Sequence, residues 1–270
     1  MRLPRNVIRA LTEGSRLAGN GQDYERASLV LRAGLARASR YEIPTAIEEQ
    51  TLVAQGWDSL GHVTRELGAY GNWAASFHLR ASRMWQTAGE PHSAGMSLLS
   101  AAHCIQRHSA SAAFELTNLA NTIKPPPATA DTLEMSIETR RAEIYRTSGD
   151  ILFAARIYSD RVVPTIRWNA VHVEWGAISL IAASTVAWRS GRLDACYDLL
   201  RDVQENYCDG VARNRIIECD LLGTEIGLFV TAGEIISVEQ RWNRLQAICL
   251  RNGYAVKNYI AFDVIAGVLR

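Results

Sequence analysis

The sequence lacks the features that mark membrane and secreted proteins. No stretch of about 18 uninterrupted apolar residues occurs, so we expect no transmembrane helix and no membrane partner. The first residues, MRLPRNVIRALTEGSR, are basic but contain no long apolar core and no small-residue cleavage site, as a signal peptide would. We therefore expect a cytoplasmic location.

Catalytic motifs and paired cysteines are also absent. No Gly-rich phosphate loop, no H-E-x-x-H and no G-x-S-x-G occurs, which weakens an enzymatic interpretation. The five cysteines are odd in number, widely spaced and without a C-x-x-C pair, so we expect buried thiols and no disulfides. His103, Cys104 and His108 form the only tight His/Cys group, and without a fourth ligand nearby we interpret it as local packing. We expect no metal and no cofactor.

The chain has no excess of charge of either sign. Its 29 Lys and Arg residues and 28 Asp and Glu residues give a net charge of +1, so no strong field favours nucleic acid. Residues 1–40 carry eight Arg against three acidic residues, a local charge of +5 that we interpret as a solvated face. Direct nucleic-acid binding is therefore not expected.

What the sequence does contain is helical spacing and internal repetition. Apolar residues recur three and four apart, and Ala, Leu, Arg and Glu fill most segments. The clearest unit is AEIYRTSGDILFAARIYSD, residues 142–160. Ala142 and Tyr145 are predicted on one helix, Gly149 in a turn, and Ala154 and Tyr158 on the returning helix. Two antiparallel helices that cross closely need a small residue at the crossing and a ring beside it.

This unit resembles the tetratricopeptide repeat, and Trp57-x-x-Leu60-Gly61 resembles the opening of the same motif, with Tyr70 later in that copy. Weaker copies follow along the chain. The small residue of each predicted second helix recurs at intervals of 47, 39, 41, 42 and 42 residues: Ala27, Ala74, Ala113, Ala154, Cys196 and Val238. The family's usual period is about 34 residues, so the first helices must be longer, roughly 45–68, 168–190 and 211–231. Long-armed repeats of this kind resemble those of bacterial peptide-sensing regulators.

The resemblance implies an all-α fold, a right-handed α-α superhelix of about six helical hairpins. We interpret residues 1–270 as a single solenoid with a bend or sub-boundary at 124–130, where Lys124–Ala128 contains three prolines. Two separately folding halves are the alternative. Asp131 and Glu134 offer a capping box for the following helix. The apolar segment 255–270 is predicted to be a helix that packs against a second copy of the chain or covers the last repeat.

In the resembling family, first helices line a concave groove that holds an extended peptide. The resemblance therefore implies a candidate groove formed by Asp58, His62, Arg65, Glu66, Glu143, Arg146, Thr185, Trp188 and Arg189. Asp58 and His62 are four residues apart and are expected to form a helix-surface ion pair. The family's clamp for chaperone C-termini needs Lys and Asn, and Asp58, His62, Thr139 and Glu143 stand there instead. We therefore expect no binding of a chaperone's carboxylate tail.

Three functions remain open from the sequence. The leading hypothesis is a scaffold or regulatory module that binds a protein or peptide segment. The second is the sensory part of a bacterial transcriptional regulator, although no helix-turn-helix is visible. The third is an enzyme on a helical scaffold, with Asp58, His62 and Glu143 as acid–base groups.

Overall fold

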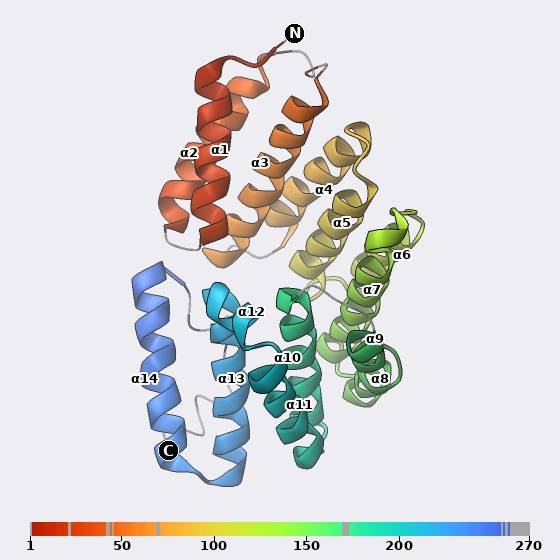
Figure 1. Ribbon diagram of the computed structural model, residues 1–270, viewed down its shortest axis with the longest axis vertical. Coiled ribbons are helices and arrows are strands. Elements are labelled where there is room, and N and C mark those ends of the chain that lie inside the picture. Colours follow the sequence, from red (N-terminus) through yellow and green to blue (C-terminus); the bar gives the residue numbers. More distant parts are fainter. Residues whose placement is uncertain are drawn as a thin grey trace. The chain divides into compact units, whose positions relative to one another are not determined.

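The computed structural model describes residues 2–20, 23–41, 44, 46–68, 71–168, 173–254, 256 and 259 (Figure 1). Within these ranges the regular structure is entirely helical. By its internal contacts the chain divides into two compact units, Met1–Arg140 and Arg141–Arg270, which are described in turn. None of the helices so described is long and apolar enough to cross a membrane.

The N-terminal unit consists of helices packed on their neighbours in chain order. Its helices are α1 (Arg5–Asn20), α2 (Tyr24–Ala38), α3 (Ile47–Glu66), α4 (Asn72–Thr87), α5 (Pro91–Ile105), α6 (Ala110–Asn121) and the first part of α7 (Pro127–Thr147). Helix α1 packs on α2, α3 on α4 and α5 on α6, and α4 also packs on α5. Leu133 and Ile137 of α7 join a buried apolar cluster with Leu98 and Leu99 of α5.

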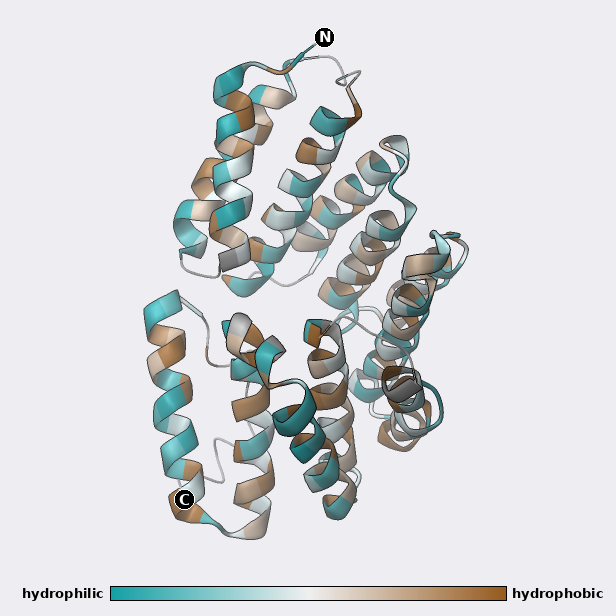
Figure 2. Cartoon of the chain, in the orientation of Figure 1, coloured by the Kyte–Doolittle hydropathy of each residue, from teal (hydrophilic) through white to brown (hydrophobic). Residues whose placement is uncertain are grey.

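The C-terminal unit contains the end of α7 and the remaining helices. These are α8 (Ile151–Ile157), the π-helical turn η1 (Tyr158–Val162), α9 (Val163–Trp168), α10 (Val173–Arg189), α11 (Leu193–Asn206), α12 (Cys208–Arg213), α13 (Arg215–Ala232) and α14 (Ile235–Asn252). Helix α10 packs on α11 and α13, and α13 packs on α14. Apolar and polar bands alternate along α14, which buries Val238, Leu245 and Cys249 on one side (Figure 2). In α13, by contrast, residues 217–228 are almost all buried.

The six predicted small residues all occupy buried positions in the first turns of a helix. Ala27, Ala74, Ala113, Ala154, Cys196 and Val238 lie in α2, α4, α6, α8, α11 and α14 respectively. The aromatic partners of the clearest unit are packed as expected, because Tyr158 is buried and Tyr145 meets Phe153 edge to face, with 4.5 Å between ring centroids. Helices packed in neighbouring pairs are therefore confirmed.

The turn at Gly149 explains how the chain reverses between α7 and α8. Gly149 has φ = 92°, a left-handed conformation that costs glycine little. The N–H of Asp150 donates to the Tyr145 carbonyl at 2.9 Å, which satisfies a carbonyl left open at the helix end. The Asp150 side chain then accepts from the Phe153 N–H and caps the next helix. The same backbone bond follows Gly191 and Gly233.

Helix boundaries agree with most, but not all, of the sequence expectations. The long first helices are found as α3, α10 and α13. Helix α7, however, begins at Pro127 and not at a capping box on Asp131, because proline is tolerated in the first turn of a helix, where its missing N–H is not needed. The single solenoid with a bend at 124–130 stays a prediction. Tyr70 and nearly all of the segment 255–270, including its expected dimer contact, lie outside the described residues.

Candidate binding site

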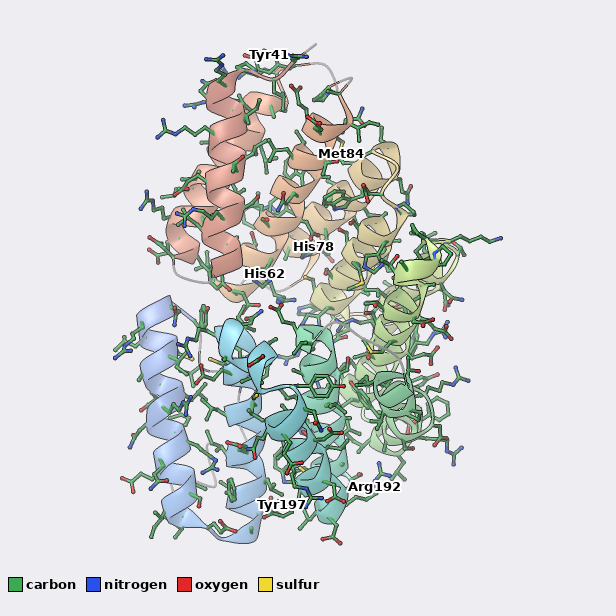
Figure 3. The ribbon with its side chains drawn as sticks, in the orientation of Figure 1. Tyr41, His62, His78, Met84, Arg192 and Tyr197 are labelled. Carbon is green, nitrogen blue, oxygen red and sulfur yellow. The ribbon has the colours of Figure 1, made fainter. Side chains whose placement is uncertain are left out.

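The four N-terminal candidate residues lie within nine positions of α3. Asp58, His62 and Arg65 are four and then three residues apart, which places them on one side of the helix, with Glu66 adjacent. The structure does not join Asp58 to His62 as the expected ion pair. Each instead bonds a residue from another helix, and Figure 3 shows the two histidines involved, His62 on α3 and His78 on α4.

Asp58 is the centre of a polar network that links three helices. Its Oδ1 accepts from His78 Nδ1 of α4 at 2.7 Å and from Ser97 Oγ of α5 at 2.9 Å. The His78 side chain is almost fully buried, at 3% exposed, whereas the Asp58 side chain is 39% exposed. The His78 ring fits because the facing position on α3 is Gly61, where a Cβ would come within 2.7 Å of the ring. Asp58 is therefore fixed in position while part of its carboxylate still meets solvent.

His62 belongs to a second network, and its partners determine which ring nitrogen carries the proton. Arg65 Nη2 lies 3.1 Å from His62 Nδ1, and a guanidinium can only donate, so Nδ1 must accept. The proton of the neutral ring is then on Nε2, which donates to the Tyr24 hydroxyl oxygen at 3.2 Å. Arg65 also donates to the buried Glu66, at 2.6 Å and 2.9 Å. The α3 residues are thus held by contacts within their own unit.

The two histidines are driven to opposite charge states. Burial lowers the pKa of His78, but the Asp58 carboxylate more than offsets it and raises the pKa to about 9. For His62, burial and the Arg65 charge lower the pKa to about 4. Burial alone would raise the pKa of Asp58, yet His78 and Ser97 leave it below its ordinary value. At neutral pH, His78 is charged and His62 is neutral.

These shifts predict a stability maximum near pH 6.5 for the N-terminal unit. His78 binds its proton more tightly when folded, so its contribution is complete below pH 6.5 and is lost as pH rises toward 9. His62 resists protonation when folded, so stability falls as pH drops from 6.5 toward 4. The alkaline loss should be about 2 kcal/mol, because solvent screens the half-exposed Asp58. Urea denaturation at a series of pH values measures both limbs.

Substituting each histidine in turn separates the acidic and alkaline limbs of this stability profile. His78→Asn should flatten the alkaline limb and leave the loss below pH 6.5 in place, whereas His62→Asn should do the reverse. An alkaline limb that persists unchanged in His78→Asn would contradict the assignment.

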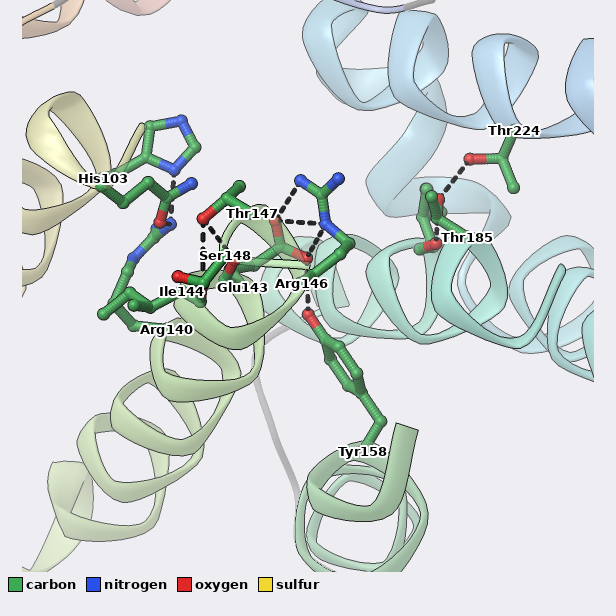
Figure 4. Close-up of polar contacts among 12 residues, drawn as sticks. His103, Arg140, Glu143, Ile144, Arg146, Thr147, Ser148, Tyr158, Thr185 and Thr224 are labelled. Carbon is green, nitrogen blue, oxygen red and sulfur yellow. Dashed lines mark hydrogen bonds and ion pairs between the residues drawn. The ribbon is translucent and has the colours of Figure 1, made fainter. Parts of the chain in front are cut away.

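In the C-terminal unit, Glu143 and Arg146 form one compact group at the end of α7. Arg146 Nη2 donates to Glu143 Oε2 at 2.6 Å, and the hydroxyl of Tyr158 donates to Glu143 Oε1 at 3.0 Å (Figure 4). The Glu143 charge, acting against burial, raises the pKa of Arg146. The tyrosine that fills the helix crossing thus also orients a charged candidate residue.

Of the three candidates on α10, Thr185 and Trp188 contact α13, and Arg189 lies beside Trp188. The hydroxyl groups of Thr185 and Thr224 are hydrogen-bonded at 2.8 Å (Figure 4). Trp188 Nε1 donates to Thr231 Oγ1 at 2.7 Å. The six-membered edge of the Trp188 ring covers Gly227, where a Cβ would come within 2.5 Å. Part of Trp188 therefore serves helix packing. Arg189 is exposed and lies 5.6 Å from the centroid of the Trp188 ring.

Sequence reasoning missed His78, Ser97 and Tyr24 as partners of the candidate residues. A signal for His78 was present, because it stands between Ala74 and Ala81 on the stripe that α4 buries. A buried imidazole in a row of alanines requires a polar partner from a neighbouring helix. Only the fold shows that this partner is Asp58, twenty residues earlier in the chain.

The His/Cys group around Cys104 contributes to packing in the same unit. In the part of the chain that is described, no three His, Cys, Asp or Glu side chains are placed to hold a metal ion. His103 bonds Arg140 of α7 through Nδ1. Cys104 lies beside the His78 ring, so that Cys104, His78 and Asp58 follow one another as in a cysteine hydrolase. Since Cys104 is 1% exposed and His78 2%, no substrate reaches the thiol in this conformation.

Fold and site together define an all-helical protein of paired helices with polar networks anchored on α3, α7 and α10. A scan against protein-family models finds no match, and a search of the curated proteins finds no relative.

Proposed function

We propose that this chain is a tetratricopeptide-like repeat protein that binds a protein or peptide segment along its first helices. The observation that carries the proposal is the buried small residue in the first turns of α2, α4, α6, α8, α11 and α14, at intervals of 39 to 47 residues. On this proposal the chain forms about six hairpins that stack as a right-handed superhelix. The first helix of each hairpin then lines a shared groove.

The positions of the candidate residues support this proposal. All nine lie on α3, α7 and α10, which are first helices in the proposed repeats. Their side chains are held in place by neighbours before any partner arrives: Asp58 by His78, Glu143 by Tyr158 and Thr185 by Thr224. A binding surface that is already ordered loses less side-chain entropy when the partner binds. The Asp58 carboxylate is partly exposed and the Arg189 side chain is exposed.

A peptide array probed with the full chain tests this proposal. Peptides that bind should lose about tenfold or more in affinity with Asp58→Asn or Arg189→Ala, because each removes one charged contact on a first helix. The matched control is Arg201→Ala, on the second helix α11, where the side chain is 65% exposed and pairs with Asp198 in the same helix turn.

Two results would count against the proposal. One is an array without a binding peptide. The other is a binding peptide whose affinity falls with Arg201→Ala but is unaffected by Asp58→Asn and Arg189→Ala. Circular dichroism of each variant shows whether the helices remain intact, so that loss of binding and loss of folding are distinguished.

A further inference from the structure

Two cysteines that the proposed binding function does not use face each other across the last pair of helices. Cys219 of α13 is 0% exposed and Cys249 of α14 is 1% exposed. Both are free thiols, and each side chain influences the pKa of the other. Thirty positions apart in sequence, they come together only because the chain reverses at Gly233.

The register of the antiparallel helices provides separate evidence that these thiols lie opposite each other. The turn is at Gly233 and Glu234, so residues equally distant from it should meet. Glu225 and Arg241, eight before and seven after the turn, are joined at 2.7 Å. Cys219 and Cys249 stand fourteen before and fifteen after the turn, about two helical turns further along the same pair of helices. On α14, Cys249 continues the buried stripe of Val238 and Leu245.

The environment gives the two sulfurs different roles. The interaction with Cys249, together with burial, raises the pKa of the Cys219 thiol, and the same interaction lowers the pKa of Cys249. The thiolate is the form that attacks a disulfide. Cys249 lies in the last turn of α14, so it is the thiol that local opening exposes first, and we assign it as the first nucleophile and Cys219 as the resolving thiol.

We propose that Cys219 and Cys249 are a dithiol pair that forms a reversible disulfide and locks α14 onto α13. The Cys249 thiolate attacks one sulfur of a small-molecule disulfide and releases one thiol, which leaves a mixed disulfide on Cys249. Cys219 loses its proton to solvent and attacks the Cys249 sulfur, releasing the second thiol. The two protein thiols lose two electrons and two protons, and the external disulfide is reduced to two thiols.

Reaction requires α14 to separate locally from α13 at the end of α14 that carries Cys249. Helix α14 packs along α13 at the end of the described chain, and its outer side exposes Ile235, Ile236 and Leu250. A helix held mainly on one side opens at a lower free energy than the interior of the unit. Cys249 lies in the last turn of α14, where fraying begins.

The test is oxidation of the full chain with an excess of oxidised glutathione at about pH 8, followed by alkylation and peptide mapping. The expected result is a linked peptide pair containing Cys219 and Cys249, a mass about 2 Da lower, and an unfolding midpoint about 5 °C higher. A reducing agent should reverse all three changes. Cys219→Ala and Cys249→Ala should each abolish the link, whereas Cys196→Ala, at a buried thiol of α11, should leave it intact.

Iodoacetamide labelling of the reduced chain at the same pH, without the oxidant, measures how readily Cys249 is reached. A pair that can be labelled but stays reduced, or carries only glutathione adducts, overturns the proposal. So does a pair that is never labelled, because the proposal requires α14 to open. The result is independent of the peptide array, since neither cysteine is among the proposed binding residues.

Discussion

His78→Ala is expected to lower the free energy of unfolding of the N-terminal unit by about 3 kcal/mol at neutral pH. The substitution removes a buried ring that fills the space over Gly61, and it leaves the Asp58 carboxylate without its cation. It also removes the hydrogen bond that joins α4 to Asp58 of α3, to which Ser97 of α5 also donates. Urea denaturation, together with hydrogen exchange of the α3, α4 and α5 amides, measures the loss and locates it.

The matched control is His108→Ala, which replaces an exposed histidine in the same unit. It should change the stability by less than about 0.5 kcal/mol. His78→Asn keeps a side chain that can still donate to Asp58, so it should recover part of the loss. Equal effects of His78→Ala and His108→Ala would show that the Asp58 network does not support the unit.

The repeat of small residues could be predicted from sequence because it is imposed by local geometry. A residue such as Ala154 recurs near the start of each second helix, where two backbones approach, and any larger side chain would separate them. Gly149 was predictable for a similar reason, since its left-handed backbone ends α7. These constraints act within one hairpin, and a single sequence therefore displays them.

Polar partners that come from other helices could not be predicted in the same way. Asp58 and His62 have the spacing of an ion pair on one helix, yet His78 competes for Asp58 from α4 and Tyr24 bonds His62 from α2. Which contact forms depends on how α2, α3 and α4 are rotated against each other. The start of α7 at Pro127 was missed because a capping signal at Asp131 was given more weight than a proline-compatible first turn.

Ala154→Leu is expected to destabilise the C-terminal unit by about 3 kcal/mol, the upper part of the range for overpacking. Ala154 is fully buried in the first turns of α8, between Phe153 and Tyr158, whose side chains contact Tyr145 and Glu143 of α7. Three added carbons must push α8 outward, which separates Tyr145 from Phe153 and draws the Tyr158 hydroxyl away from Glu143. One substitution at the crossing therefore affects both the packing and a candidate binding group. Thermal unfolding measures the effect on packing. Peptide binding, compared with that of Tyr158→Phe, which lacks the hydroxyl that contacts Glu143, measures the effect on the candidate binding group.

Arg156→Leu inserts the same side chain two residues later, at an exposed position of α8. It isolates the effect of the crossing from the effect of placing leucine in this helix, and it should change the stability by less than about 0.5 kcal/mol. If Ala154→Leu were tolerated as well as Arg156→Leu, the helices would not need a small residue there. The periodic small residues would then have no role in packing. The proposal of a stacked repeat with a shared binding surface would lose its main support.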